Sequence, residues 1–266
     1  MDTTMKQYSD FEILELICAA EREGAALIMQ ASDVLAECKT GHKDVVTQYD
    51  RRVQELLVER LSSAVESARF FCEENDRQDD LNAEHVFIID PIDGTMNFVR
   101  GLNHSCISVA YMSRGQLRAA AVYNPYVDEM FTATLGGGAH LNGKPIHASD
   151  AELSASLVCC GTSPYLTQLA DKSFKLMKEI FLISLDIRRQ GSAALDLCSA
   201  ASGRAGLYFE LSTSLWDYAA GLLIVQEAGG LCLDCEGKPM PLDGRKSSVA
   251  AGSPKAVEEF VKLAAE

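Results

Sequence analysis

The sequence of 266 residues lacks any apolar run that approaches the ~20 residues needed to span a bilayer, so we expect no membrane partner. We also expect no secretory signal peptide, because the first residues, MDTTMKQYSDFEIL, are acidic and polar. The nine cysteines are scattered along the chain, and their number is odd. Together these features predict reduced thiols and a cytoplasmic location.

Positive charge is scarce as well. The chain has 24 Lys and Arg residues against 38 Asp and Glu residues, which gives a formal net charge of −14. Its longest basic cluster is a pair such as Arg188-Arg189, whereas nucleic-acid-binding proteins usually present basic patches. We therefore expect no nucleic-acid partner. The excess of carboxylates fits either a solvated surface or a site that collects cations.

No Ser-, Pro- or Gly-rich linker and no internal repeat divides the chain. Apolar residues make up 47% of the sequence, which is enough for a sizeable core. We therefore predict one domain over residues 1–266, with an N-terminal half at about 1–148 and a C-terminal half at about 149–266. Helical and strand patterns alternate along the whole length, which predicts a mixed α/β (α+β) fold.

The periodicity of apolar residues locates these elements. Helical spacing predicts helices over residues 9–33, 50–65, 165–181, 192–203, 216–230 and 253–266. Short β-branched or aromatic runs predict strands within residues 68–76, 85–90, 156–163, 205–211 and 231–245. Residues 39–50 predict a turn with a short extended piece. Residues 104–149 predict an antiparallel series, with hairpin turns at Arg114-Gly115 and Asn142-Gly143.

The stretch IIDPIDGTMNF, residues 88–98, places two carboxylates at the end of a buried strand. Pro91 disfavours helical geometry at Asp90, so Asp90 and Asp93 can converge from an irregular turn. With the Ile92 carbonyl between them, they offer three oxygen ligands, which suits a hard cation such as Mg²⁺. An Asx-type turn that caps a helix explains the same residues equally well.

Further residues fit either an ordinary structural role or a role in a site. Gly94 permits a close backbone approach, and Thr95 starts a segment whose N–H groups can face an anion. Asp217 begins an apolar helix, where an acidic N-terminal cap is common. Glu73 and Glu74 follow an apolar pair and are equally compatible with a solvent-exposed loop.

In combination, these segments resemble the inositol monophosphatase family, part of the magnesium-dependent, lithium-sensitive phosphatase superfamily. DPIDGTMNF resembles the first motif of the family, and WDYAAGLLIVQEAGG resembles the second. The resemblance extends upstream to KTGHKDVVTQYD and downstream past SVAAGS, so it covers most of the chain. It implies a layered αβαβα sandwich, a homodimer, two or three Mg²⁺ ions in each site and a small phosphate monoester as substrate.

The resemblance also implies roles for individual residues. The implied metal ligands are Glu73, Asp90, the Ile92 carbonyl, Asp93 and Asp217. The implied catalytic residues are Thr95, its partner Asp50, and Glu73. The implied substrate contacts are Asp93, Gly94, Thr95, Gly191, Ser192, Ala193 and Glu210, and Lys39 and Asp44 match the upstream motif.

The sequence departs from the family pattern at a few positions. Cys72 stands where the family usually has Gly, and the loop from Glu73 to Asp90 looks short, which leaves the geometry of Glu73 open. Ser192 replaces the usual Thr and keeps the hydroxyl. We attach no role to Met96. The lone pair Cys232 and Cys235 lacks a second ligand pair for zinc, which favours simple packing residues.

The implied reaction is the hydrolysis of myo-inositol monophosphate to inositol and phosphate by a metal-activated water. Two alternatives stay open from sequence. One is a phosphatase for another small substrate, namely fructose 1,6-bisphosphate or a nucleotide 3′- or 2′-phosphate. The other is a non-catalytic regulatory binding protein with this fold. A protein that no longer used the site would be expected to lose carboxylates, because unneutralised acids in one cleft repel each other.

Overall fold

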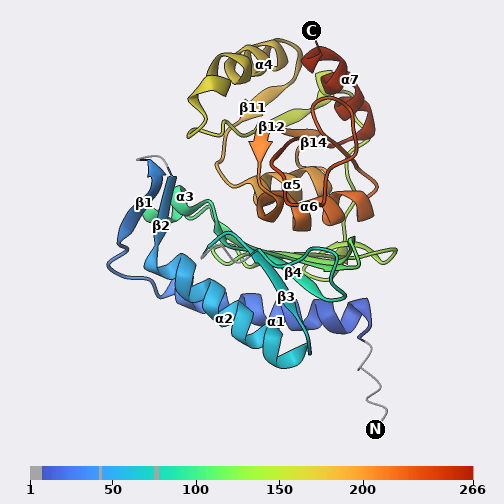
Figure 1. Cartoon of the computed structure of the whole chain (residues 1–266). Coiled ribbons are helices and arrows are strands. Elements are labelled where there is room, and N and C mark those ends of the chain that lie inside the picture. Colours follow the sequence, from blue (N-terminus) through green and yellow to red (C-terminus); the bar gives the residue numbers. More distant parts are fainter. Residues whose placement is uncertain (1–7, 42–43, 75–77, 266) are drawn as a thin grey trace.

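The computed structural model describes residues 8–41, 44–74 and 78–265, and its helices and sheets stack in alternating layers (Figure 1). Helices α1 and α2 form the first layer, followed by one sheet, helices α5 and α6, a second sheet, and helices α4 and α7. This order confirms the predicted layered αβαβα sandwich. The helices are α1 (Asp10–Met29), α2 (Gln48–Ala64), α4 (Ala170–Ile183), α5 (Ala193–Ala201), α6 (Leu215–Glu227) and α7 (Pro254–Ala264).

The first sheet is seven-stranded, with the order β3-β4-β5-β6-β7-β8-β9. Its strands are β3 (Arg69–Cys72), β4 (Val86–Asp93), β5 (Cys106–Ser113), β6 (Gln116–Asn124), β7 (Glu129–Thr134), β8 (Gly138–Leu141) and β9 (Lys144–Pro145). Strands β4 to β9 pair antiparallel, which confirms the predicted series. Both predicted hairpin turns have positive φ angles, at Arg114-Gly115 and at Asn142-Gly143.

The second sheet is five-stranded, with the order β11-β10-β12-β14-β13. Its strands are β10 (Leu157–Cys160), β11 (Asp186–Arg188), β12 (Leu207–Thr213), β13 (Leu231–Leu233) and β14 (Ser247–Gly252). Strand β11 was not predicted, because three residues at a sheet edge are too short to show a period. The helix predicted from residue 165 begins at Ala170, after a 3₁₀ turn at Thr167–Leu169, and α1 ends four residues before the predicted end.

A smaller unit lies beside the first sheet. Strands β1 (Ala36–Gly41) and β2 (Asp44–Thr47) pair antiparallel and lead directly into α2. Strand β2 is the extended piece predicted within residues 39–50, whereas β1 was not predicted as a strand. Figure 1 shows this hairpin next to the short helix α3 (Thr95–Val99). Residues 42–43 of the predicted turn lie outside the described residues.

Packing on both faces explains why β4 and α6 are rich in apolar residues. Every residue of β4 is buried, because α1 and α2 cover one face of its sheet and α5 and α6 cover the other. Helix α6 is buried on nearly all sides between the two sheets. At Gly221, an added Cβ would lie 2.6 Å from Leu197 Cβ, so the missing side chain allows α5 and α6 to pack closely.

The described cysteines form no disulfides with one another, and most of them are buried. Cys38 is exposed, whereas Cys232 and Cys235 are buried, which agrees with the packing role expected for these two. No described helix combines the length and apolar character needed to cross a membrane.

One acidic side chain is buried in the first layer of the fold. Glu21 of α1 is fully buried, and neither of its carboxyl oxygens has a hydrogen-bond partner among the described residues. Burial raises the pKa of Glu21 well above its ordinary value, and the neighbouring Arg22 charge opposes this shift only in part. Glu21 is therefore expected to be protonated in the folded protein at pH values where the unfolded chain carries its charge.

Glu21→Gln is expected to stabilise the protein at neutral pH. Because the folded pKa is raised, the stability contributed by the protonated acid is complete below the unfolded pKa of about 4.3 and is lost as the pH rises towards the folded pKa. Between these two pKa values, the free energy of unfolding of the wild type falls by about 1.4 kcal/mol per pH unit relative to that of the variant. Urea unfolding at pH 5 and pH 8 measures this difference. The exposed Glu15→Gln is the control, and an equal gain at both pH values contradicts the prediction.

Candidate active site

The site begins at the C-terminal end of β4. The predicted strand end at Asp90 was too early, because β4 continues to Asp93 through an irregularity in its pairing with β5. Pro91, which has no N–H to donate, lies within this bulge. The Ile92 N–H donates to Asp90 Oδ1 at 3.1 Å. The Asx-type turn is therefore present, and it fixes one oxygen of the first candidate ligand.

Gly94 turns the chain from β4 into α3. Its φ of +89° lies in the left-handed region, and an added Cβ would be 3.1 Å from the His104 carbonyl oxygen and 3.2 Å from the Gly191 carbonyl oxygen. Gly94 is therefore required both for its conformation and for the close approach of these two backbone segments. Thr95 follows as the first residue of α3.

The Thr95 hydroxyl lies between two acceptors. Its Oγ1 is 3.1 Å from Asp50 Oδ1 and 3.0 Å from the Ile92 carbonyl oxygen. The other oxygen of Asp50 accepts from the Thr47 N–H at 2.8 Å, in the capping box that starts α2. Burial raises the pKa of Asp50 to about 6. This cap was not predicted, although the Thr47-x-x-Asp50 spacing is typical of a capping box.

The charges of acidic side chains from different parts of the chain affect one another at the end of β4. Burial raises the pKa of Asp90 and of Asp217 well above the ordinary value and that of Asp93 to about 6, and the charge of Glu73 acts in the same direction on all three. Among the described residues, however, no group of three or more His, Cys, Asp or Glu side chains is arranged so that it could hold a metal ion without a change in side-chain positions. The carboxylates form one electrostatic cluster that is open towards a pocket.

Asp217 caps a helix, and its side chain also lines the pocket. It is the third residue of α6, and its Oδ2 accepts from the Ser214 N–H at 2.6 Å as a helix cap. The same side chain lines the pocket. The preceding Trp216 packs against Phe71, with ring centroids 5.8 Å apart, and so fixes the start of the helix against the first sheet.

Asp93 links the two halves of the chain. Its Oδ2 accepts from the Ser192 hydroxyl at 2.5 Å and from the Ala194 N–H at 2.8 Å. Ser192 is buried at the N-terminus of α5, so its hydroxyl holds Asp93 in place. This contact brings the predicted substrate segment Gly191–Ala193 to the carboxylate cluster.

Glu210 projects from β12 into the same pocket and is held by several donors. Its Oε1 accepts from the Ser163 N–H at 2.7 Å and from the Ser163 hydroxyl at 2.8 Å, and its Oε2 accepts from the Tyr208 hydroxyl at 2.8 Å. An added Cβ at Gly161 would lie 1.7 Å from Oε2, so the carboxylate packs directly on that backbone. The direction of Glu210 is therefore fixed before a substrate arrives.

Lys39 lies on the other side of the cluster. Its Nζ is 2.8 Å from Glu73 Oε1 and also contacts Glu74. Partial burial lowers the pKa of Lys39, but the charges and hydrogen bonds of Glu73 and Glu74 together outweigh this effect and raise the pKa overall. Asp44 starts β2, but its side chain lies outside the described part, as do residues 75–77 of the loop after Glu73.

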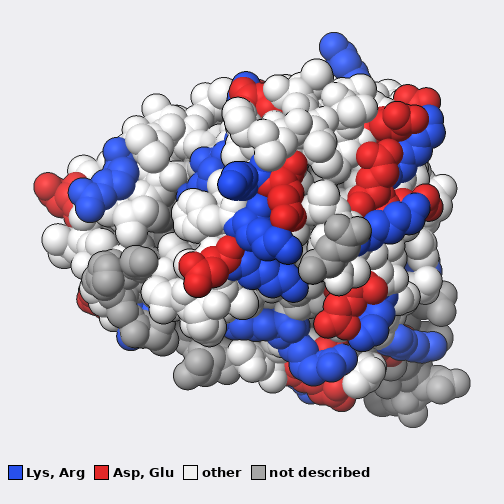
Figure 2. Space-filling view, turned by 90° about the horizontal axis from the view of Figure 1, so that it is seen from above, with Lys and Arg blue, Asp and Glu red and all other residues white. Residues whose placement is uncertain are grey.

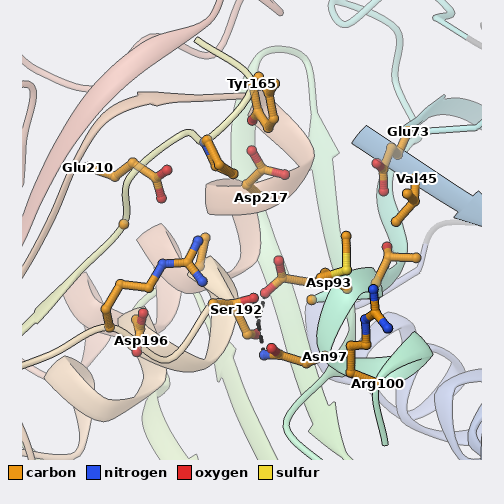
Figure 3. Close-up of a pocket in the computed structure, with 18 residues that line it drawn as sticks. Val45, Glu73, Asp93, Asn97, Arg100, Tyr165, Ser192, Asp196, Glu210 and Asp217 are labelled. Carbon is orange, nitrogen blue, oxygen red and sulfur yellow. Dashed lines mark hydrogen bonds between the residues drawn. The ribbon is translucent and has the colours of Figure 1, made fainter. Parts of the chain in front are cut away.

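Many of these residues surround a cavity of about 600 Å³ (Figure 3), whereas Lys39, Asp50, Asp90 and Ile92 do not line it. Asp93 lies near its centre, with Glu73 on one side and Glu210 on the other. Of the predicted residues, Asp93, Gly94, Thr95, Gly191, Ser192, Ala193, Glu210, Glu73 and Asp217 line it. Sequence reasoning had assigned no role to Val45, Met96, Asn97, Arg100, Tyr165, Arg189 and Asp196, which line it as well.

The donor set fits Mg²⁺. Carboxylates and a backbone carbonyl are the oxygen ligands that this ion prefers, and their mutual repulsion calls for positive charge. The Lys39 ammonium already supplies such a charge at Glu73. Glu73, Asp90, the Ile92 carbonyl, Asp93 and Asp217 would hold the ion or ions.

The sequence model of the inositol monophosphatase family matches residues 10–266. A protein of Neisseria meningitidis serogroup B named putative Nus factor SuhB is 36% identical over 249 residues, which cover 92% of this chain and 94% of that protein. An inositol-1-monophosphatase of Mesorhizobium japonicum is 35% identical over 242 residues, which cover 90% of each chain.

Solved structures have the same fold. The extragenic suppressor protein SuhB of Bartonella henselae superposes with a TM-score of 0.88 at 29% identity, covering 95% of this chain and 98% of that chain. A protein named SaIMPase-II, solved with 2′-AMP bound, superposes with a TM-score of 0.81 at 26% identity, covering 95% of this chain and 93% of that chain.

Proposed function

Because the chain belongs to the inositol monophosphatase family, we propose that it is a Mg²⁺-dependent phosphomonoesterase that hydrolyses myo-inositol monophosphate to inositol and phosphate. The observation that carries this proposal is the carboxylate cluster. Asp90 and Asp93 lie on β4, Glu73 follows β3 and Asp217 lies on α6. Burial and the Glu73 charge raise the pKa of all three aspartates, and the cluster lies beside the hydrogen-bonded pair Thr95 and Asp50. A cluster of this kind is costly unless cations occupy it.

The chemistry follows from the geometry of the chain's own groups. When bound, Mg²⁺ lowers the pKa of a coordinated water and offsets the charge of the phosphate. Thr95 has a single hydroxyl proton to donate to Asp50 or to the Ile92 carbonyl, so its lone pairs are left to accept from the attacking water. Asp50 then takes up the proton through Thr95, and Glu73 helps to orient the water.

Substrate contacts are proposed on the opposite side of the cavity. Glu210, fixed by its donors, is placed to accept from a ring hydroxyl of the inositol. The Gly191–Ala193 backbone and Asp93 contact neighbouring hydroxyls, and the backbone at Gly94 and Thr95 contacts the phosphate. Lys39 borders the Glu73 side, and a role for Asp44 stays a prediction from the sequence.

We further propose that residues 1–266 form one domain, with halves at about 1–148 and 149–266, and that the protein is a cytoplasmic homodimer. Two features of the fold support the division. The seven-stranded sheet ends at Pro145, and the five-stranded sheet begins at Leu157. Sedimentation of the purified chain measures the assembly.

Magnesium is expected to be required for phosphate release from inositol 1-phosphate, and lithium is expected to inhibit it. The physical reason is that an acidic cluster repels an anionic substrate until cations neutralise it. Phosphate release with Mg²⁺, with EDTA and along a lithium titration measures both effects. Equal release in EDTA would contradict the proposed mechanism.

A second candidate is a phosphatase for another small ester, such as fructose 1,6-bisphosphate or a nucleotide 2′- or 3′-phosphate. The likeness to a structure that holds 2′-AMP supports it. The carboxylate cluster and the pair Thr95 and Asp50 would serve such a substrate unchanged. A panel of phosphate monoesters ranked by kcat/KM decides between the two.

A third candidate is a regulatory binding protein, because several relatives are named Nus factors. These names do not support the expectation that the chain has no nucleic-acid partner. The retained carboxylates favour catalysis, since a purely binding role would not maintain their repulsion. Turnover in the magnesium assay separates catalysis from binding alone.

A further inference from the structure

The arginines of this acidic protein are mostly neutralised by ion pairs. On the face shown in Figure 2, Lys and Arg side chains lie next to Asp and Glu. Arginines with a carboxylate within 4.0 Å are Arg22, Arg51, Arg60, Arg114, Arg118, Arg188, Arg204 and Arg245. Two arginines that line the candidate active site, Arg100 and Arg189, form no ion pair with any described residue. Unpaired positive charge is therefore present inside the cavity.

Arg189 is held over the wall that bears the proposed substrate contacts. It lies between β11 and α5, and an added Cβ at Gly191 would be 2.5 Å from Arg189 Nη1. Because Gly191 has a φ of +89° and no side chain, the guanidinium can lie directly against its backbone. Any larger residue at position 191 would push it away.

The neighbouring acids leave this guanidinium free. Asp196 accepts from Gln190 Nε2 at 3.1 Å, and burial raises its pKa to about 8, so it is largely uncharged at neutral pH. Glu210 is already occupied by Ser163 and Tyr208. A guanidinium that is unpaired in a cavity is suited to bind an anionic group of a ligand.

A further positive charge, which does not itself line the cavity, lies beside one of the lining residues. Lys246 Nζ lies 5.3 Å from the ring centroid of Tyr165, which lines the cavity. By contrast, Figure 3 shows Arg100 on the side of Glu73 and Val45, across Asp93 from Asp196 and Glu210. Arg189, whose guanidinium lies against Gly191, belongs instead to the wall with the proposed substrate contacts at residues 191–193.

We propose that Arg189 binds a second phosphate group of the substrate, so that the chain prefers small sugar or nucleoside bisphosphates over the matching monophosphates. This inference rests on the proposed phosphatase function and names its substrate class. The reacting phosphate lies at the carboxylate cluster, and the second phosphate accepts hydrogen bonds from the planar guanidinium. A cavity of about 600 Å³ has room for such a ligand.

The test compares two pairs of substrates on the full chain with Mg²⁺. One pair is fructose 1-phosphate and fructose 1,6-bisphosphate, and the other is adenosine 3′-phosphate and adenosine 3′,5′-bisphosphate. Arg189→Ala is expected to lower kcat/KM for the bisphosphates by about ten- to a hundredfold, mainly through KM, with little change for the monophosphates. The matched control is Arg188→Ala, which removes the same charge from the adjacent residue, whose guanidinium pairs with Asp186.

The outcomes separate the two proposals. An unchanged bisphosphate-to-monophosphate ratio in Arg189→Ala, with magnesium-dependent turnover intact, overturns the second-phosphate site and leaves the phosphatase. An equal loss in Arg188→Ala also overturns it, because the effect is then long-range charge. If no substrate is turned over, the proposed function fails. Calorimetric binding of fructose 1,6-bisphosphate then decides: weaker binding to Arg189→Ala supports the site, and equal binding overturns it.

Discussion

Asp93→Asn is expected to lower phosphate release by about a thousandfold or more, because a proposed metal ligand loses its charge at the centre of the site. Asp93 is the acid through which the two halves meet, since its Oδ2 accepts from Ser192 and from the Ala194 N–H. The Asn oxygen can accept the same two hydrogen bonds. The substitution therefore removes charge and leaves the local contacts in place.

The thermal stability of metal-free Asp93→Asn, unlike its activity, is not expected to fall. Without metal, Asp93 is one of several carboxylates that repel each other, so its neutral replacement relieves repulsion. The Tm of the metal-free variant is then equal to that of the wild type or above it. Added Mg²⁺ should raise the Tm of the wild type by mass action, and that of the variant much less.

Two measurements test this prediction together. Phosphate release from inositol 1-phosphate gives the activity, and thermal unfolding with and without Mg²⁺ gives the linkage. Asp171→Asn, an exposed acid in the first turn of α4, is the matched control and should behave as wild type. Near-normal turnover in Asp93→Asn would rule out a metal mechanism at this cluster.

The fold was largely predictable because its signals are local and long. Hairpin turns with positive φ join strands of the antiparallel series, and β4 begins with the apolar run of residues 86–89. Strand β11 escaped prediction because its three residues pair only through the tertiary structure, parallel to β10. The start of α4 was misplaced because a 3₁₀ turn has nearly the same apolar spacing as the first turn of a helix.

The candidate site was predictable where one motif supplies several groups. Asp90, the Ile92 carbonyl and Asp93 follow from a single stretch, and Asp217 follows from a second. The sequence does not show which charged side chains form ion pairs. Arg188 and Arg189 are identical in local sequence character, yet one pairs with Asp186 and the other lines the cavity without an ion pair.

Two carboxylates both cap a helix and take part in the candidate site, so these roles are not alternatives. Asp217 was weighed as either a helix cap or a ligand, but one of its oxygens caps α6 while the side chain still lines the cavity. Asp50 likewise closes the capping box of α2 with one oxygen and meets Thr95 with the other. A capping hydrogen bond fixes the side chain, and a fixed carboxylate is better placed for catalysis.

Thr95→Ala is expected to lower kcat by about a hundred- to ten-thousandfold, the range of a positioned proton-transfer group. The variant loses the hydroxyl that lies 3.1 Å from Asp50 Oδ1 and 3.0 Å from the Ile92 carbonyl oxygen. Thr95→Ser keeps this hydroxyl and is the matched control, with kcat expected within about tenfold of the wild type.

A double-substitution cycle with Asp50→Asn identifies the role of the pair. If Thr95 passes a proton to Asp50, each single variant removes the same relay, and the double variant is hardly slower than either one. Circular dichroism checks that α2 persists, because Asp50 also caps that helix. Fully additive losses would mean that Thr95 and Asp50 act independently. In that case the hydrogen bond between them is structural, and the base that accepts the proton of the water must be sought among the carboxylates of the cluster.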